Sequence, residues 1–183
     1  ATPMGLRKNA LLGAARMIEA IHQVGMANLP GVASVGLIEN RPNSRNVVPG
    51  EVFFTVDLRH PDEKVLDRME AEYQAALPKI AAELGLELEE KRIWISPAVK
   101  FAPNLIDCVR EGAQQASYSM REMASGAGHD AAYIARVTPT TMIFVPCLGG
   151  ISHNEAESTT LEECGAGSQV LLNAVLAYDR TLA

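Results

Sequence analysis

The sequence predicts two structural parts: an α+β part with an antiparallel sheet, followed by an α/β layer. In the first part, two strand-like runs at 31–39 and 51–59 follow each other along the chain, which predicts an antiparallel pair. In the second part, helical segments alternate with apolar runs. The run at 140–146 is continuous, as in strands buried on both faces. The pattern changes character around Ser96–Pro103, so the domain boundary is expected there.

Two helices are predicted in the first part. Apolar residues recur at helical spacing from Leu6 to Val24, and Gly25 ends that pattern. The second helix begins at the sequence HPDE, residues 60–63, and its apolar stripe stops at Gly85. Pro78 lies inside this stripe. Because proline removes one helical hydrogen bond, a kink or a local distortion is expected there.

The strand at 51–59 alternates between apolar and polar residues, as a half-buried strand does. Asp57 and Arg59 therefore lie on the face opposite the apolar residues. The connection to the preceding strand, at 40–50, is long for a hairpin. Residues 86–95, LELEEKRIWI, predict a third strand.

The second part is predicted to alternate helices and strands. Its expected elements, in order, are a helix at 104–116, a short strand at 120–124, a helix after the glycine-rich turn at 125–130, and a strand at 140–146. Thr160 and Glu163 have the spacing of a capping box, in which two residues satisfy each other's backbone N–H groups. The last helix is therefore expected to begin there and to run to about Tyr178.

The composition argues against several classes of protein. A net charge of −6 and a pI near 5.2 leave no basic stripe to neutralise phosphates, which argues against nucleic-acid binding. No apolar run approaches the roughly 20 residues that cross a bilayer, so no membrane partner is expected. The three cysteines have unrelated spacings and predict reduced thiols in a cytoplasmic protein, with Cys108 in the core.

Two loops follow predicted strands of the second part, at Ser125–Asp130 and Cys147–Glu157, and each carries a histidine among glycines. In an α/β layer, ligands collect beyond the carboxyl ends of the strands. His153 is therefore a candidate metal ligand, and His129 a candidate ligand contact. The alternatives are a solvated loop histidine at 153 and a helix-capping contact at 129. The residues by themselves establish only a candidate cleft.

Four segments of the sequence carry a family pattern. They are TPMGLRKNALLGAA, RPNSRNVVPGEVFFTVDLRHPD, SGAGHDA and MIFVPCLGGISHNEAE. The chain thereby resembles the hydantoinase/carbamoylase family of amidases over essentially its whole length, because the segments occur there in the same order. The family includes N-carbamoyl-L-amino acid hydrolases, allantoate amidohydrolases and β-ureidopropionases. The resemblance implies a metal-dependent amidohydrolase that cleaves the C–N bond of N-carbamoyl-L-amino acids or related ureido acids, without choosing among them.

The resemblance also implies a fold and a cofactor. Family members have an α/β catalytic domain with two divalent metal ions, into which a lid domain is inserted. The lid is an antiparallel sheet with two helices and forms a homodimer. Residues 1–96 correspond to the lid without its first strand, and residues 97–183 to the C-terminal part of the catalytic domain. His153 matches the last metal ligand. A histidine with carboxylates suits Zn, Mn, Co or Ni alike.

Four residues match the family's substrate-binding positions. Asn46 and Arg59 match the pair that binds the substrate carboxylate from the partner subunit's lid. Arginine suits this role because its guanidinium presents a planar fork of donors. Gly128 and His129 lie in the segment that closes over the substrate. From the residues alone, Asn46 would only stabilise a turn, and Arg59 would be a solvated strand residue.

The family's catalytic base and remaining metal ligands match no residue of this sequence. They are expected upstream of Ala1, where the sequence opens without an initiator methionine. The fragment alone is therefore expected to be inactive. The alternative is a non-catalytic module that uses the lid surface for dimerisation or ligand binding. A reading frame that continues upstream through H-x-D and E-E motifs would favour the first interpretation.

Overall fold

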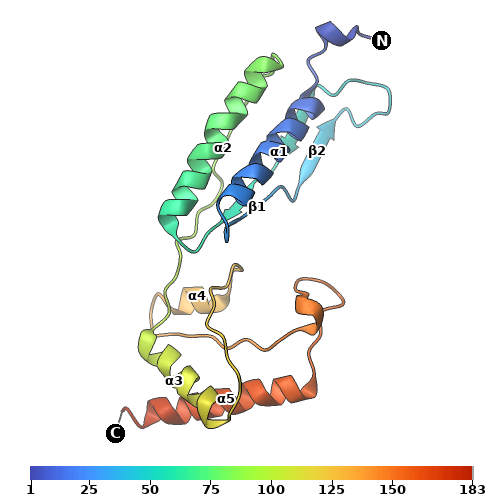
Figure 1. The fold of residues 1–183 in the computed structure, drawn as a ribbon. Helices are drawn as coiled ribbons and strands as arrows, with labels where there is room; N and C mark the ends of the chain where they lie inside the picture. The colour runs from blue at the N-terminus through green and yellow to red at the C-terminus, as the bar shows by residue number, and fades with distance from the viewer. Residues whose placement is uncertain (183) are drawn as a thin grey trace. The chain divides into compact units, whose positions relative to one another are not determined.

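The structure is a computed structural model that describes residues 1–182. The chain forms two compact units, Ala1–Ala98 and Val99–Ala183, each with its own packed interior (Figure 1). The division falls within the segment where the sequence pattern changes. None of the helices in the described part of the chain is long and apolar enough to cross a membrane.

The first helix of unit 1, α1, spans Ala10–Ala27. It begins after Asn9, whose side-chain oxygen accepts hydrogen bonds from two N–H groups of the first turn. A short 3-10 helix, η1 (Met4–Leu6), precedes it. The predicted helix is confirmed, but it starts later than Leu6 because the Asn9 cap fixes its first turn, and it continues past Gly25.

The second helix of unit 1, α2, spans Glu63–Glu83 and packs against α1 (Figure 1). It begins after Asp62, whose carboxylate accepts a hydrogen bond from the first turn, and it continues through Pro78 as one helix. Gly85 follows with a φ of 63°, in the left-handed region that glycine adopts without steric cost. The predicted helix and its stop are confirmed.

The strands of unit 1 form an interrupted antiparallel hairpin. Its two ladders join β1 (Val32–Ser34) to β4 (Asp57–Arg59), and β2 (Ile38–Arg41) to β3 (Glu51–Phe54). Between the ladders, the Thr55 N–H donates a hydrogen bond to the Leu37 carbonyl oxygen at 3.1 Å. The predicted antiparallel pairing is confirmed, with the run at 51–59 divided into two strands.

The interior of unit 1 lies where the two helices meet the hairpin. Its buried residues are Met17, Ile21, Leu77 and Ala81. Phe54 and Val56 are half-buried and pack against this cluster from the hairpin. Because alternate strand residues face opposite sides, Asp57 and Arg59 lie exposed at the two ends of β4 while Leu58 is half-buried. This confirms the predicted orientation of Arg59.

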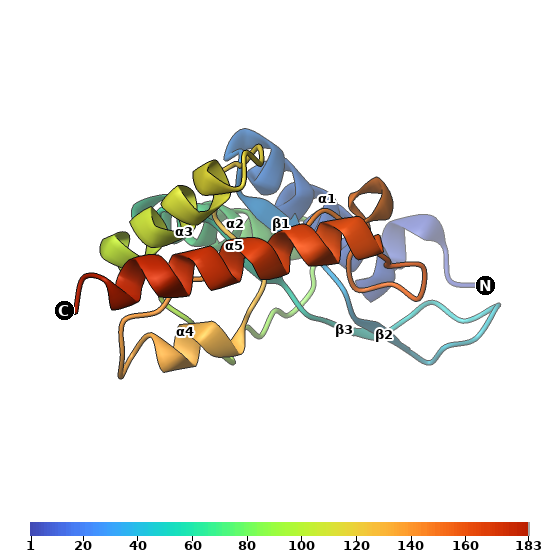
Figure 2. The ribbon, with the colours of Figure 1, turned by 90° about the horizontal axis from the view of Figure 1, so that it is seen from below.

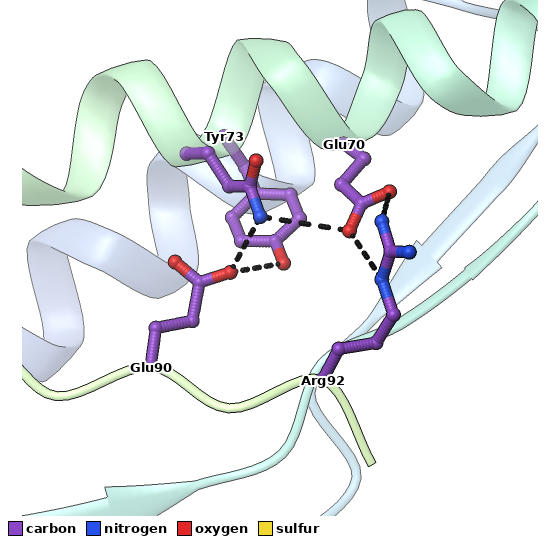
Figure 3. Close-up of polar contacts among 5 residues, drawn as sticks. Glu70, Tyr73, Glu90 and Arg92 are labelled. Carbon is purple, nitrogen blue, oxygen red and sulfur yellow. Dashed lines mark hydrogen bonds and ion pairs between the residues drawn. The ribbon is translucent and has the colours of Figure 1, made fainter. Parts of the chain in front are cut away.

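The predicted third strand at 86–95 is wrong for the described residues, because no strand forms there. Side chains hold this segment near α2 instead (Figure 3). The Tyr73 hydroxyl donates to Glu90 at 2.8 Å, and Arg92 Nε donates to Glu70 at 2.9 Å. Burial, together with the Glu90 carboxylate, raises the pKa of Tyr73. A strand needs a neighbouring strand for its backbone hydrogen bonds, and an alternating sequence alone does not supply one.

Unit 2 is built on two helices, α3 (Pro103–Gln115) and α5 (Leu161–Asp179), which pack against each other (Figure 2). Their shared interior consists of Cys108, Ala174 and Ala177. Gly112 lets the helices approach closely, because an added Cβ would lie 2.9 Å from the Val170 carbonyl oxygen. Both predicted helices and the buried position of Cys108 are confirmed.

The start of α5 is the predicted capping box. Thr160 Oγ1 accepts a hydrogen bond from the Glu163 N–H at 3.1 Å, and the Glu163 carboxylate accepts one from the Thr160 N–H at 3.4 Å. The helix predicted after the glycine-rich turn is also present as α4 (Asp130–Ile134), although it is only five residues long. The local capping box is therefore sufficient to define the start of α5, whereas α4 begins after His129 without a side-chain cap.

The strands predicted in unit 2 at 120–124 and 140–146 are wrong for the described residues, which form no strand there. The segment at 140–146 is half-buried rather than buried on both faces, and Phe144 is 52% exposed. An apolar groove of about 730 Å³ lies between residues 138–145 and the helices α3 and α5. A strand of a parallel sheet requires neighbours beside it, and no neighbouring strand is present among residues 99–182.

Candidate functional site

The loop that carries His153, residues 147–159, is closed by two hydrogen bonds at its base. The Leu148 N–H donates to the Ser158 carbonyl oxygen at 2.8 Å. Thr159 Oγ1 donates to the Pro146 carbonyl oxygen, also at 2.8 Å. The two ends of the loop therefore lie side by side, which is typical of compact surface loops with a fixed shape.

His153 adopts an unusual backbone conformation within this loop. Its φ is 57°, a left-handed value that costs a non-glycine residue roughly 1–3 kcal/mol. The preceding pair, Gly149 and Gly150, has φ values of 63° and 68°. These form part of the short 3-10 turn η2 (Leu148–Gly150), where a side chain would be strained in the same way. The glycine pair thus allows the turn, while His153 needs another source of stabilisation.

The imidazole of His153 is exposed, and its Nδ1 lies 3.1 Å from Ser152 Oγ. The other nitrogen, Nε2, makes no hydrogen bond among the described residues. A neutral imidazole whose one nitrogen is held by a hydrogen bond presents the other as a metal donor. The position therefore fits one ligand of a metal site.

Glu157 connects both sides of this loop. Its Oε2 accepts a hydrogen bond from the His153 backbone N–H at 2.9 Å. Its Oε1 faces Cys147 Sγ at 3.8 Å. The Glu157 N–H in turn donates to the Asn154 carbonyl oxygen at 2.9 Å. Sequence reasoning assigned no role to Glu157. The sequence signal that could have pointed to Glu157 is its position four residues after His153, with the turn-forming Asn154 between them.

The potential metal ligands among the described residues do not gather into a complete site. Residues 1–182 contain no group of three or more His, Cys, Asp or Glu side chains that could hold a metal ion. Catalytic zinc sites usually take three protein ligands, and here His153 is one nitrogen donor. The residues present therefore fit one ligand of a metal centre, and further ligands would have to come from elsewhere.

The second predicted loop, Ser125–Asp130, holds His129 by its side chain. Ser125 Oγ and His129 Nε2 are hydrogen-bonded at 2.6 Å, and Ser125 Oγ also accepts from the Ala127 N–H at 3.2 Å. The His129 ring packs at a tilt against Phe144, with ring centroids 5.5 Å apart. An added Cβ at Gly128 would meet no atom within 4 Å, so packing within the described residues does not require glycine there.

The Arg59 guanidinium, in unit 1, directs two of its N–H donors at one carboxylate. Its Nε and Nη2 donate to the two carboxylate oxygens of Asp57 at 2.9 and 2.7 Å, with each side chain about half exposed. This hydrogen-bonded pair lowers the pKa of Asp57 and raises the pKa of Arg59. The geometry shows that the guanidinium at this position can hold a carboxylate through two hydrogen bonds.

Asn46 lies in the exposed turn between β2 and β3. Its Oδ1 accepts a hydrogen bond from Ser44 Oγ at 3.1 Å. This contact is the turn-stabilising role that the residues alone suggested. The candidate residues thus lie in both units: Asn46 and Arg59 in unit 1, and Gly128, His129 and His153 in unit 2.

The folded units and the histidine loop match a known family. Residues 7–177 fit the model of Peptidase family M20/M25/M40, and the chain belongs to this family. It is 48% identical over 176 residues to an N-carbamoyl-L-amino-acid amidohydrolase of Rhizobium meliloti, covering 96% of this chain and 42% of that protein. It is 33% identical to the allantoate amidohydrolase of Escherichia coli K12, covering 97% and 43%.

Solved structures confirm the similarity to hydantoinase/carbamoylase amidases. An amidase of that family from Burkholderia multivorans is 49% identical and superposes with a TM-score of 0.90, covering 96% of this chain and 43% of its own. A Bacillus subtilis protein described as a dinuclear metal-binding peptidase of the M20 family shares the fold at 18% identity, with a TM-score of 0.62 and coverage of 92% and 46%. The chain spans less than half the length of these proteins.

Proposed function

We propose that this chain is part of a metal-dependent amidohydrolase that cleaves the C–N bond of N-carbamoyl-L-amino acids or related ureido acids. One observation carries the proposal: relatives named for N-carbamoyl-L-amino-acid and allantoate hydrolysis match this chain from end to end. Two structural features support it. The His153 loop is held by hydrogen bonds, and the Arg59 guanidinium binds a carboxylate through two hydrogen bonds.

His153 is proposed as a metal ligand through Nε2. When bound, a divalent ion such as Zn, Mn, Co or Ni polarises a carbonyl oxygen and lowers the pKa of water. The contribution of this chain is to hold the imidazole in one position. The loop closure and the Glu157 contact supply that restraint. A catalytic base and the other ligands, for one or two ions, are proposed to lie outside this chain.

Arg59 is proposed to bind the substrate carboxylate, as it binds the carboxylate of Asp57 in the structure. Asn46 is proposed to assist through its side-chain amide, which can donate to the same group. Gly128 and His129 are proposed to contact the substrate from the Ser125–Asp130 loop. The open space at Gly128 leaves room for a ligand beside the backbone.

Residues 1–96 are proposed to act as a lid that forms a homodimer, and residues 97–183 as the C-terminal part of a catalytic domain. The antiparallel hairpin with two helices in unit 1 supports the lid assignment. The extended apolar segment and groove of unit 2 support the second assignment, because such surfaces are usually covered.

The test is an assay of the complete polypeptide that contains this chain, loaded with Mn or Zn, on N-carbamoyl-L-amino acids. We expect turnover in the parent protein, on the order of 1 per second or more, and its loss together with metal affinity in His153→Ala. The 183-residue chain alone should give no turnover. Metal affinity that is equal in the parent and His153→Ala would contradict the assignment and favour a non-catalytic binding module.

A further inference from the structure

Glu157 sits at the centre of the hydrogen bonds that shape the His153 loop. We propose that Glu157 is a positioning residue: its carboxylate fixes the backbone of His153 in the left-handed conformation, so that the imidazole is aimed before any metal ion binds. This inference rests on the proposed role of His153 as a metal ligand. It adds the group that determines the direction of the His153 imidazole.

The first observation is that the backbone of His153 has a conformation that is unfavourable for a residue with a side chain. Its φ of 57° lies in the region that side-chain-bearing residues rarely adopt. The one side-chain group that accepts its N–H is Glu157 Oε2, at 2.9 Å. A carboxylate is a strong acceptor for a backbone N–H, so this contact favours the unusual conformation over extended alternatives.

The second observation is that Glu157 is itself held in place from two directions. Its backbone N–H donates to the Asn154 carbonyl oxygen, and the Asn154 side chain accepts from the Ala156 N–H, both at 2.9 Å. These contacts form a turn that brings Glu157 back beside His153. The second carboxylate oxygen faces Cys147 Sγ on the opposite side of the loop. The carboxylate therefore spans the loop instead of pointing away from it.

The third observation is that, away from its closed base, few other contacts restrain the loop next to the histidine. Gly149 and Gly150 precede it, and glycine gives the chain more conformational freedom than any other residue. The side chains of residues 151–159 are all exposed within the unit. Without the Glu157 contact, the imidazole would sample several directions. Binding a metal ion would then require it to be ordered first, which weakens affinity.

The experiment compares three variants of the holoenzyme: Glu157→Ala, Glu157→Gln and Glu155→Ala. Glutamine keeps a carbonyl oxygen that can accept the His153 N–H, whereas alanine does not. Glu155 is a matched control, since it is exposed in the same loop and makes no side-chain hydrogen bond or ion pair among the described residues. The readouts are the Mn or Zn dissociation constant by calorimetry and the hydrogen exchange rate of the His153 amide in the metal-free protein.

We expect Glu157→Ala to weaken metal binding about tenfold, in line with losses of residues that orient metal ligands, and to speed exchange of the His153 amide. Glu157→Gln should stay within about threefold of the parent, and Glu155→Ala should match it. Losses in Glu157→Gln and Glu155→Ala as large as the loss in Glu157→Ala would show a charge effect and overturn the proposal. Unchanged affinity in Glu157→Ala would also overturn it.

Three further outcomes keep the inference separate from folding and from the proposed function. If Glu157→Ala does not fold, fast exchange of the His153 amide in the parent protein would still refute the proposed contact. If His153→Ala leaves metal affinity unchanged, the proposed function fails. If His153→Ala loses affinity while Glu157→Ala keeps it, only the positioning role of Glu157 fails.

Discussion

Replacing Arg59 by alanine should lower kcat/KM of the holoenzyme about 5- to 60-fold on substrates with a free carboxylate. A hydrogen bond to a charged group contributes about 1.5–3 kcal/mol. In the structure the guanidinium already holds Asp57, about half exposed, and an exposed pair of this kind is worth about 0.5 kcal/mol, which the substrate has to displace. The net loss is therefore about 1–2.5 kcal/mol, and each 1.4 kcal/mol is about tenfold.

The assay is steady-state kinetics of the parent, Arg59→Ala and Arg41→Ala. Arg41 is a matched control because it is an exposed arginine of the same hairpin, with carboxylates of Glu39 and Glu51 at 3.5 Å. The Arg41→Ala variant should retain the activity of the parent. Asn46→Ala should show a smaller loss than Arg59→Ala, and the two losses should not add, because both residues would hold one group.

A substrate analogue whose carboxylate is converted to an amide gives the decisive comparison. The parent should lose most of its advantage over Arg59→Ala on that analogue, since the charge that the guanidinium recognises is gone. If the ratio between the two enzymes is the same on both substrates, Arg59 does not bind the carboxylate. A loss in Arg41→Ala as large as in Arg59→Ala would point to a general charge effect of the hairpin.

Two other predictions concern packing and assembly. Gly112→Ala should lower the free energy of unfolding by about 1–3 kcal/mol in thermal denaturation, since its Cβ would lie 2.9 Å from the Val170 carbonyl oxygen and 3.0 Å from the Ala174 nitrogen. Gly165→Ala, also within a helix but with no atom within 4 Å of the added Cβ, should instead raise it by up to about 1 kcal/mol. Light scattering of the chain at high micromolar concentration should show self-association through residues 1–96, and a strictly monomeric mass would count against the proposed dimer.

The helices could be predicted from the sequence because their determinants are local. The capping box of Thr160 and Glu163 and the stop at Gly85 each involve residues within a few positions of one another. The cap at Asn9 is equally local, but it was missed and the start of α1 was placed too early. The hairpin was predictable for a related reason, since its strands are neighbours in sequence. Only its interruption near Thr55 was missed, because alternation of side chains does not reveal a break in backbone pairing.

The isolated strands could not be predicted correctly because a strand is defined by its partner. Residues 86–95 and 140–146 have the composition of strands, yet neither is paired within the described chain. At 86–95, side-chain contacts such as Tyr73 to Glu90 replace a ladder. At 140–146, packing on two helices buries only part of the apolar surface. Sequence pattern reports which residues suit a strand, and it carries no information about what lies beside them.

The same distinction explains which parts of the candidate site were accessible from the sequence. Residue types and motif order identified His153, His129, Asn46 and Arg59, but they did not identify the groups that hold these side chains. The restraint on His153 comes from Glu157 through its backbone N–H, a contact that depends on the chain path and not on the histidine side chain. The restraint on His129 comes from Ser125 within the same glycine-rich loop.

The loop at 147–159 reaches a defined shape although the apolar segment before it remains unpaired. Its hydrogen bonds, from Leu148 to Ser158 and from His153 to Glu157, all close within the loop itself. Closing a short loop costs little chain entropy, so this shape does not depend on a complete sheet. A loop of this kind can reach its shape before its neighbours in the domain are in place. Under the proposed function, the remaining metal ligands would then only have to be brought to an imidazole that is already in place.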